Sequence, residues 1–294
     1  MTYLAARATT QRFRRTCWFA FAVVATLTWV TGGSVVTAPT KISAAEAVVT
    51  PETSIAVRST SVDFATGIGV YESASSRFRL RIQGSGTTSV WAVQYGIPGD
   101  RPLMGDWNAD GIDTVGVKRG NTYYVRNSNT AGPADIRFSY GRGTDIPVVG
   151  DWNGDGIDTV AIRRDSLWYV RNSLSTGPSD YRFSFGRTDD TPIAGDWNAD
   201  RIATAGVYHT GTNNWYLMTG PDVVTNFAYG KPGDTPLAGD WNGDHHATAG
   251  VCRGSNWYLK NSLSGGNADI TVNFGAPTDI PLVGHWYPLI VTPT

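Results

Sequence analysis

One unit of about 45 residues recurs along this chain, and that periodicity restricts the folds open to it more than any other feature. The motif (Tyr/Phe)-Gly-x-x-x-Asp-x-Pro starts at Tyr95, Tyr140, Phe185, Tyr229 and Phe274, at successive steps of 45, 45, 44 and 45 residues. Each copy contains four short apolar segments separated by turn-forming residues, without helical periodicity. Four strands joined by tight turns in such a unit are typical of a propeller blade. The sequence therefore predicts an all-β fold of four-stranded blades.

The two ends of the repeat region complement each other. Residues 67–94 match the later strands of a repeat without its beginning, with GVY at 69–71 aligned with VAI at 160–162. Residues 274–286 match the beginning of a repeat without its end. N- and C-terminal half-blades that combine in this way close a ring and remove exposed strand edges. Four whole repeats and one shared blade predict a five-bladed β-propeller over residues 64–288.

The segments outside the ring have other compositions. Within residues 1–45 the basic run RFRR precedes the apolar run CWFAFAVVATLTWV and small residues up to ISAA, which is typical of a signal peptide. Retention of this segment as an N-terminal anchor is the alternative. Residues 46–63 are predicted to be a linker and 289–294 a C-terminal tail. We expect a protein that is secreted or attached to the cell surface, with no membrane contact once the signal peptide is removed.

Charge and cysteine content restrict the partners. The net charge is −1, and removal of residues 1–45 takes away five basic residues and no acid, so it falls to about −6. Nucleic acid is excluded as a partner because it requires a basic stripe. Cys17 lies in the predicted signal peptide, which leaves Cys252 without a disulfide partner. We therefore expect a monomer stabilised by its core or by metal.

A loop with the composition of a calcium site follows the first strand of each repeat. The two best copies are GDWNADGIDT at 105–114 and GDWNGDGIDT at 150–159. Calcium prefers oxygen ligands at alternate positions of a loop that contains glycine. The candidate ligands, counted from the aspartate at positions 1, 3, 5, 7 and 9, are Asp106, Asn108, Asp110, Ile112 and Thr114 in the first loop and Asp151, Asn153, Asp155, Ile157 and Thr159 in the second.

Two further copies of this loop have diverged. Arg201 replaces the glycine in the third copy and His245 in the fourth, so we expect no metal there. The acidic and amide residues that these copies keep are Asp196, Asn198, Asp200, Asp240, Asn242 and Asp244. For the first two loops the alternative to calcium is a metal-free Asx-turn, in which Asp and Asn side chains bond backbone N–H groups.

The tandem pattern FG…GDWNGDG is similar to the FG-GAP (VCBS-type) repeats of integrin α-subunit propellers and of many secreted bacterial proteins. The resemblance covers roughly residues 64–288 and implies calcium bound through loop positions 1, 3, 5, 7 and 9. The ninth residue in that family is usually aspartate, whereas here it is Thr114 or Thr159, and Asp113 and Asp158 stand at position 8. Two carboxylates with neutral oxygens would hold calcium weakly, in the ~10⁻⁴–10⁻³ M range.

The distribution of aromatic and acidic residues favours binding over catalysis. Tryptophan recurs in register, and we expect most of these rings to pack between blades rather than hold sugars. Arg126, Arg171 and Lys260 also recur, which indicates a role in the fold or in a repeated surface. An active site needs particular groups in one place, yet the aspartates repeat in register and Glu72 is the one glutamate of the ring. The sequence predicts no enzyme.

Repeated shallow sites suit recognition of a polymer, because weak sites gain through avidity. We therefore expect a non-catalytic module that binds a cell-wall or extracellular glycan. A platform for adhesion or for an extracellular protein partner is the alternative, and a propeller hydrolase is a third.

Overall fold

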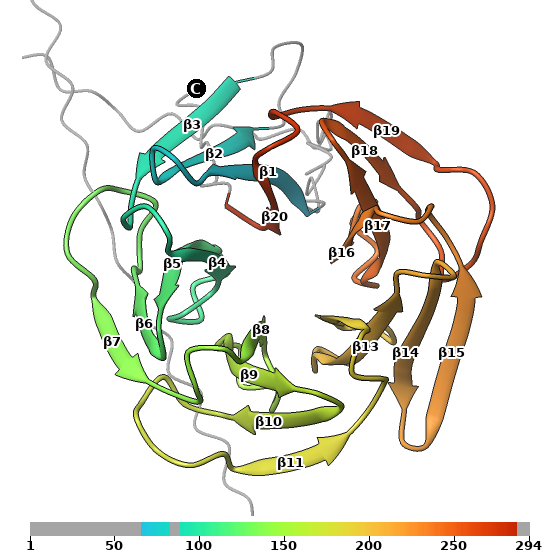
Figure 1. Ribbon diagram of the computed structural model, residues 1–294, viewed down its shortest axis with the longest axis horizontal. Helices are drawn as coiled ribbons and strands as arrows, with labels where there is room; N and C mark the ends of the chain where they lie inside the picture. The colour runs from blue at the N-terminus through green and yellow to red at the C-terminus, as the bar shows by residue number, and fades with distance from the viewer. Residues whose placement is uncertain (1–65, 83–88, 287–294) are drawn as a thin grey trace, which may run out of the picture. The chain divides into compact units, whose positions relative to one another are not determined.

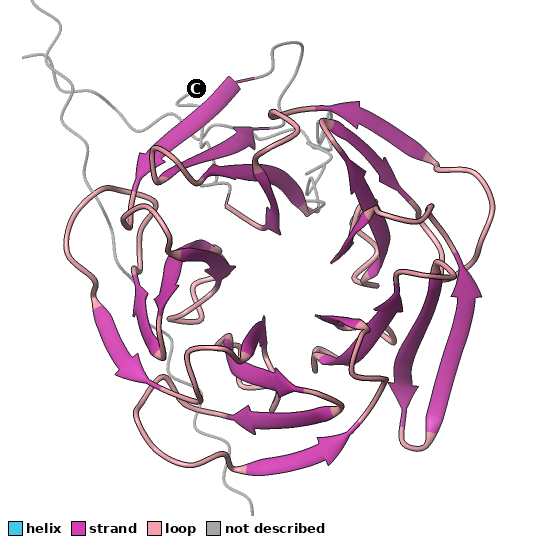
Figure 2. Ribbon diagram, viewed as in Figure 1, coloured by secondary structure: helices cyan, strands magenta, loops and turns pink. Residues whose placement is uncertain are grey.

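The computed structural model describes residues 66–82 and 89–286, which form five four-stranded antiparallel sheets around a ring (Figure 1). These residues contain strands and loops but no helix (Figure 2), so none of them provides a helix that could span a membrane. The predicted five-bladed propeller is confirmed. The predicted signal peptide, linker and C-terminal tail lie outside the described residues.

Each complete repeat folds as one blade with its first strand nearest the centre of the ring. The first blade consists of β4 (Arg101–Gly105), β5 (Thr114–Arg119), β6 (Thr122–Val125) and β7 (Ile136–Ser139). The second consists of β8 (Ile146–Gly150), β9 (Thr159–Arg164), β10 (Leu167–Arg171) and β11 (Tyr181–Ser184). The third consists of β12 (Thr191–Gly195), β13 (Thr204–His209), β14 (Asn214–Gly220) and β15 (Val223–Ala228). The fourth consists of β16 (Thr235–Gly239), β17 (Thr248–Arg253), β18 (Asn256–Leu259) and β19 (Ile270–Asn273).

The closing blade combines strands from both ends of the chain. It consists of β20 (Ile280–Gly284) at the centre, followed by β1 (Gly67–Glu72), β2 (Arg77–Ile82) and β3 (Ser89–Gln94). The C-terminal part thus supplies the innermost strand and the N-terminal part the other three. Val70 lies opposite Pro281 as Ile162 lies opposite Pro147, so these two residues are equivalent. The predicted alignment of GVY with VAI is therefore wrong by one residue. The apolar pattern of the sequence did not fix the register, whereas pairing with the innermost strand fixes it.

Sequence features of the innermost strands follow from their position at the channel. Each has proline as its second residue, as in Pro102 of β4. An innermost strand pairs on one side only, so a residue without an N–H group is tolerated there. Each also ends in glycine, because the blades approach closely at the centre. A Cβ on Gly105 would lie 2.9 Å from Val149 Cγ1 of the next blade.

The hydrophobic core lies between neighbouring blades. In one cluster, Met104 and Val115 of blade β4–β7 pack against Tyr71, Val93 and Trp286 of the closing blade. The tryptophans that follow the innermost strands are all buried, with at most 5% of their surface exposed, and these are Trp107, Trp152, Trp197, Trp241 and Trp286. Trp168, Trp215 and Trp257 on the third strands are fully buried. The expectation that these rings pack between blades is confirmed.

Candidate functional site

The DWNxDG loops connect the innermost strand of a blade to its second strand, and their aspartates bind the backbone of their own loop. One carboxylate oxygen of Asp106 accepts N–H bonds from Asn108 (3.3 Å) and Asp110 (3.1 Å), and the other accepts one from Gly111 (2.7 Å). Asp110 accepts a bond from the N–H of Ile112 (2.9 Å) and another from the side-chain amide of Asn108 (2.9 Å). The loop is therefore closed as an Asx-type turn by its own side chains.

The diverged copies keep this turn. Asp196 accepts the N–H of Arg201 and Asp240 accepts that of His245, at the position where the first two loops have glycine. Arg201 and His245 both have φ of 69°, near the 81° of Gly111. They occupy a left-handed conformation that glycine adopts at lower cost. The turn is thus a requirement of the blade that survives the loss of its glycine.

The structure brings together the candidate ligands at positions 1, 3 and 5 of each loop. They are Asp106, Asn108 and Asp110; Asp151, Asn153 and Asp155; Asp196, Asn198 and Asp200; and Asp240, Asn242 and Asp244. The ninth residue lies elsewhere, because Thr114 is buried and its hydroxyl donates to the carbonyl of Arg126 (2.6 Å). In the first loop Oδ2 of Asp106 and both oxygens of Asp110 accept one hydrogen bond each and keep a lone pair. The residues at positions 1, 3 and 5 therefore fit a weak calcium site, although the turn closes without metal.

The same loops join each blade to the one before it, a role that the sequence did not indicate. The backbone N–H of the eighth loop residue donates to the carbonyl of the first loop residue in the preceding blade, as Asp158 does to Asp106 (2.7 Å). Equivalent bonds join Asp113 to His285, Ala203 to Asp151, Ala247 to Asp196 and Thr66 to Asp240. These five bonds form a closed circle at the centre of the ring.

At three of the five junctions a side chain adds a reciprocal bond. Oxygens of Asp113, Asp158 and Thr66 accept the N–H groups of His285 (2.7 Å), Asp106 (2.9 Å) and Asp240 (2.9 Å), respectively. Ala203 and Ala247 occupy the other two junctions and offer no polar side chain. The two aspartates at position 8 thus point away from the DWNxDG loops that precede them and bind the neighbouring blade.

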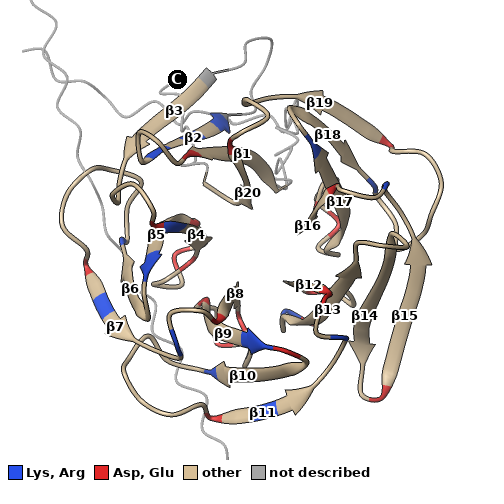
Figure 3. Ribbon diagram, viewed as in Figure 1, with Lys and Arg blue, Asp and Glu red and all other residues tan. Residues whose placement is uncertain are grey.

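A cavity of about 430 Å³ at the centre of the ring is lined by Asp113, Asp158 and His285 among other residues. Acidic segments lie at the inner ends of several blades, and many basic residues lie on the middle and outer strands (Figure 3). Burial raises the pKa of Asp113, against the opposing effect of the His285 N–H group. Burial, followed by the charge of Asp113, raises the pKa of Asp158. Burial also lowers the pKa of His285, so this cavity disfavours charge of either sign.

A second set of aspartates lies in the turns that lead into each innermost strand. Asp234 is fully buried and forms a bidentate pair with Arg253, with both N–O distances at 2.7 Å. It also accepts the N–H of Lys231 (2.7 Å), which closes the turn. Arg119 pairs with Asp100 and Arg164 pairs with Asp145 in the same way. Such forked pairs are among the stronger hydrogen-bonded contacts in proteins.

Two blades depart from this pairing. His209 takes the place of the arginine in blade β12–β15 and lies 2.8 Å from Asp190. With Asp189 these two residues form a group spaced closely enough to hold a metal ion. In the closing blade Glu72 stands at the arginine position, and among the described residues no cation pairs with Asp279.

Two cavities of about 260 Å³ each lie at equivalent places between neighbouring blades. Each is lined by the Tyr-Gly pair that follows an outer strand, by a valine and an arginine of the next blade's second strand, by a tyrosine of its third strand and by the following loop. The first is lined by Tyr95, Gly96, Val117, Arg119, Tyr124 and Ala134. The second is lined by Tyr229, Gly230, Val251, Arg253, Tyr258 and Ala268. We call them the inter-blade pockets.

The two inter-blade pockets share an arginine stacked on a tyrosine, and they differ in Lys231, which lines the second pocket. The guanidinium of Arg119 lies 5.0 Å from the ring centroid of Tyr124, and that of Arg253 lies 4.9 Å from that of Tyr258. Each arginine is neutralised by its aspartate and uses Nε and Nη2 for that pair. Tyr95 is buried, and its hydroxyl has no hydrogen-bond partner within the described part of the chain. The residues of each pocket fall within one repeat of the sequence, but its tyrosine and glycine follow the outer strand of the preceding blade, so the repeat pattern alone does not reveal the pocket.

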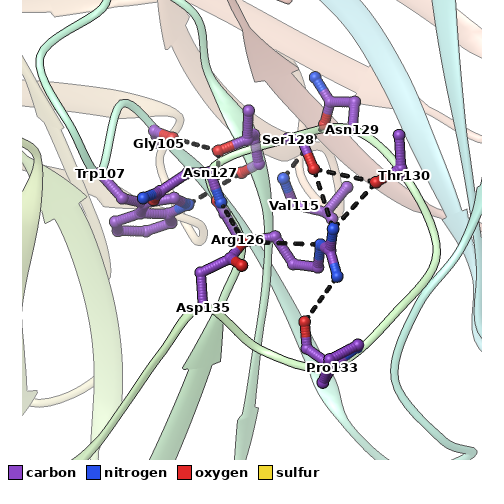
Figure 4. Close-up of polar contacts among 11 residues, drawn as sticks. Gly105, Trp107, Val115, Arg126, Asn127, Ser128, Asn129, Thr130, Pro133 and Asp135 are labelled. Carbon is purple, nitrogen blue, oxygen red and sulfur yellow. Dashed lines mark hydrogen bonds and ion pairs between the residues drawn. The ribbon is translucent and has the colours of Figure 1, made fainter.

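The loop between β6 and β7 forms one wall of the first inter-blade pocket, and Arg126 holds it in place (Figure 4). Its guanidinium donates to the carbonyl of Pro133 (2.6 Å) and to the hydroxyls of Ser128 (3.0 Å) and Thr130 (2.9 Å). Asp135 accepts the N–H of Asn127 (2.8 Å) at the base of the loop. The predicted role of this recurring basic residue in the fold is confirmed.

Comparison with known proteins identifies no family. No protein-family model matches the chain, and no curated protein matches it. Among solved structures, a chain of the Photorhabdus luminescens Tc holotoxin pore is similar, with a TM-score of 0.37 and 9% sequence identity. The match covers 67% of this chain and 11% of that chain, so the protein spans about a tenth of the length of its structural match. The five-bladed architecture rests on the strand pairing described above.

Proposed function

We propose that this protein is a secreted, non-catalytic binding module that recognises a cell-wall or extracellular glycan at more than one site. The supporting observation is the pair of inter-blade pockets, which recur at equivalent positions with the same residue types. Each pocket offers an arginine, a tyrosine and backbone groups, which are donors and acceptors suited to sugar hydroxyls. Two identical weak sites on one rigid ring bind a repeating polymer more tightly than either site alone.

The central carboxylates support a role without catalysis. Asp113 and Asp158 are buried and have raised pKa values. Both features are common among the carboxylates of active sites. Both side chains, however, accept backbone N–H groups of the preceding blade. A carboxylate that is needed for this contact is not free to exchange protons with a substrate.

The test is retention of the purified chain on insoluble chitin, cellulose and peptidoglycan, in millimolar calcium and again in EDTA. We expect retention on at least one glycan and elution by its soluble fragments. A folded protein that ignores every glycan in the panel would contradict the proposal. Loss of retention in EDTA would assign the loops a part in binding, whereas retention in EDTA would assign binding to the pockets alone.

Calcium is proposed as a weak structural ligand of the first two DWNxDG loops. Asp106, Asn108 and Asp110, and their counterparts in the second loop, would hold the ion, and Ile112 and Ile157 would add carbonyl oxygens. The resemblance to FG-GAP repeats supports this proposal, and so does the clustering of these side chains. Bound calcium would add positive charge to an acidic rim and stiffen the turn.

A platform for protein partners is the second candidate. The observation that favours it is the exposed hairpin of blade β12–β15, where Val223 is 53% exposed and Val224 is 46% exposed on an outer edge strand. Edge strands with exposed apolar side chains are sites where other chains add. Loss of a captured protein partner after Val224→Lys, with glycan retention unchanged, would establish this second activity.

A further inference from the structure

The blades differ in the residues that stand at the positions lining the two inter-blade pockets. We propose that the ring binds two sugar units, one at blade β4–β7 and one at blade β16–β19, and that the valine of the second strand keeps these pockets open. The inference rests on the proposed function and assigns it a location, a stoichiometry and a ligand class. The ligand is a single neutral, hydroxyl-rich sugar ring within a polysaccharide.

Val117 and Val251 stand at the back of the two pockets, each facing a glycine of the neighbouring blade. A Cβ on Gly96 would lie 3.0 Å from Val117 Cγ1, and one on Gly230 would lie 3.0 Å from Val251 Cγ1. In blade β8–β11 the equivalent residue is Ile162, whose additional methyl group extends towards Gly141. A Cβ on Gly141 would lie only 2.5 Å from Ile162 Cδ1. The facing residue also stands closer in the two other blades, where a Cβ on Gly186 would lie 2.7 Å from Val207 Cγ1 and one on Gly275 would lie 2.6 Å from Val70 Cγ1. Val117 and Val251 thus leave more space before their glycines than the equivalent residues of the other three blades.

The two remaining blades each lack a different wall. In blade β12–β15 the third strand ends at Gly220 and the fourth begins at Val223. A short turn therefore replaces the long loop that carries Ala134 in blade β4–β7. His209 also replaces the arginine there. In the closing blade Glu72 replaces the arginine, which exchanges a donor for an acceptor. Within residues 66–82 and 89–286, the complete set of walls is thus found only in the two blades that flank the closing blade (Figure 1).

Size and charge indicate the ligand class. Each pocket measures about 260 Å³, below the ~300–1,000 Å³ that holds a drug-sized molecule, so it suits one sugar ring. Arg119 is paired with Asp100 and Arg253 with Asp234, and Lys231 also lines the second pocket. The arginine Nη1 group remains to donate to a hydroxyl. A polyol can use this donor together with the tyrosine and the backbone groups of the pocket.

The experiment measures stoichiometry in the full chain by titration calorimetry, with chitotriose and cellotriose as probes. Wild type should bind two equivalents. Val117→Ile and Val251→Ile, which introduce the residue that blade β8–β11 already tolerates, should each reduce this number to one, and the double variant should bind at least tenfold more weakly. Val207→Ile is the matched control, because it makes the same change in a blade without the pocket, and it should leave two sites.

A second pair of variants protects the test against a folding defect. Ala134→Leu and Ala268→Leu fill the pockets from the surface loops and leave the core untouched, and they should give the same losses. A stoichiometry of five, or two sites retained in both double variants, would overturn the inference while the proposed function stood. Absence of binding to the oligosaccharides and to every insoluble glycan would overturn both.

Discussion

The two repeated sets of aspartates in this ring differ in what satisfies their carboxylates. Asp234 is buried and depends on the guanidinium of Arg253. Asp106 is bound by N–H groups of its own loop, which every sequence supplies. The first set therefore loses its ion pair when the cation changes, as at Asp279 of the closing blade, where Glu72 stands at the arginine position. The second set survives wide sequence change, as in the loop that carries Arg201, because it depends on backbone alone.

The largest expected effect comes from removing one member of the buried pair. Asp234→Ala leaves Arg253 without its acid and the Lys231 N–H without its acceptor. Loss of one partner of a buried pair destabilises a protein by ~3–5 kcal/mol. Since Arg253 is partly exposed and becomes hydrated, we expect a value near the lower end of that range. Urea unfolding followed by tryptophan fluorescence measures it.

The control is the equivalent change in the closing blade. Asp279 accepts the N–H of Ala276 (2.8 Å), and no cation of the described residues pairs with it. Asp279→Ala should therefore cost only the turn hydrogen bond, about 1 kcal/mol. Equal losses at the two positions would mean that the arginine contributes nothing and that the two sets do not differ as described.

The next largest expected effect is a loss of folding stability in acid, through the aspartates that pair with arginine. Burial raises the pKa of Asp145, but the side chain of Arg164 and the N–H of Arg142 lower it further, so the net pKa is below its ordinary value of 3.8. The unfolded chain then binds more protons than the folded one, and the stabilisation present above pH 4 is lost as pH falls through the folded pKa. A tenfold difference in the proton affinity of the carboxylate between the two states corresponds to ~1.4 kcal/mol.

Asp145→Asn tests this linkage. The variant should be less stable than wild type at pH 7, and the two unfolding free energies should converge between pH 4 and pH 2. Unfolding curves at four pH values across that range measure the difference. Parallel pH profiles would show that the Arg164 pair does not set the acid response.

The blade count and the core were predictable because each signal lies within one repeat. The step between Tyr95 and Tyr140 sets the blade length, and the tryptophans recur at the blade interfaces because every interface needs a large ring. The register of the closing blade was not predictable to one residue. β1 is buried on both faces, so its apolar residues show no alternation that could choose between two alignments, and only pairing with a strand more than 200 residues away selects one.

The candidate site was less predictable because it is built between blades. The position of Asp113 and Asp158 as the eighth loop residue is visible in the sequence, but their acceptor role depends on the backbone of the preceding blade. Ala203 and Ala247 break that pattern and hide it from a comparison of repeats. The inter-blade pockets depend on the distance between a residue of the second strand and the facing glycine, which differs between Val117 and Ile162 and is known only once the blades are packed.

The loops bound by backbone alone should improve when their glycine is restored. Arg201 has positive φ, so Arg201→Gly should stabilise the protein by about 1 kcal/mol. Gly111→Arg is the reverse change, and because a Cβ there would meet no atom within 4 Å, its cost should be that of backbone strain alone, about 1 kcal/mol. A destabilised Arg201→Gly variant would show that the arginine side chain makes a stabilising contact.

Calcium should have the smallest effect on folding stability, and we expect it at the first two DWNxDG loops but not at the third and fourth. For a dissociation constant of ~1 mM, 1 mM calcium stabilises the folded state by ~0.4 kcal/mol per site, or ~0.8 kcal/mol for two loops. This corresponds to a rise in Tm of ~2–3 °C for a ring of this size. Asp106→Asn with Asp151→Asn should abolish the rise, whereas Asp196→Asn with Asp240→Asn should not, because Arg201 and His245 stand beside those carboxylates. A rise that disappears only in the second pair, or that magnesium reproduces in full, would place the ion elsewhere and leave all four loops as hydrogen-bonded turns.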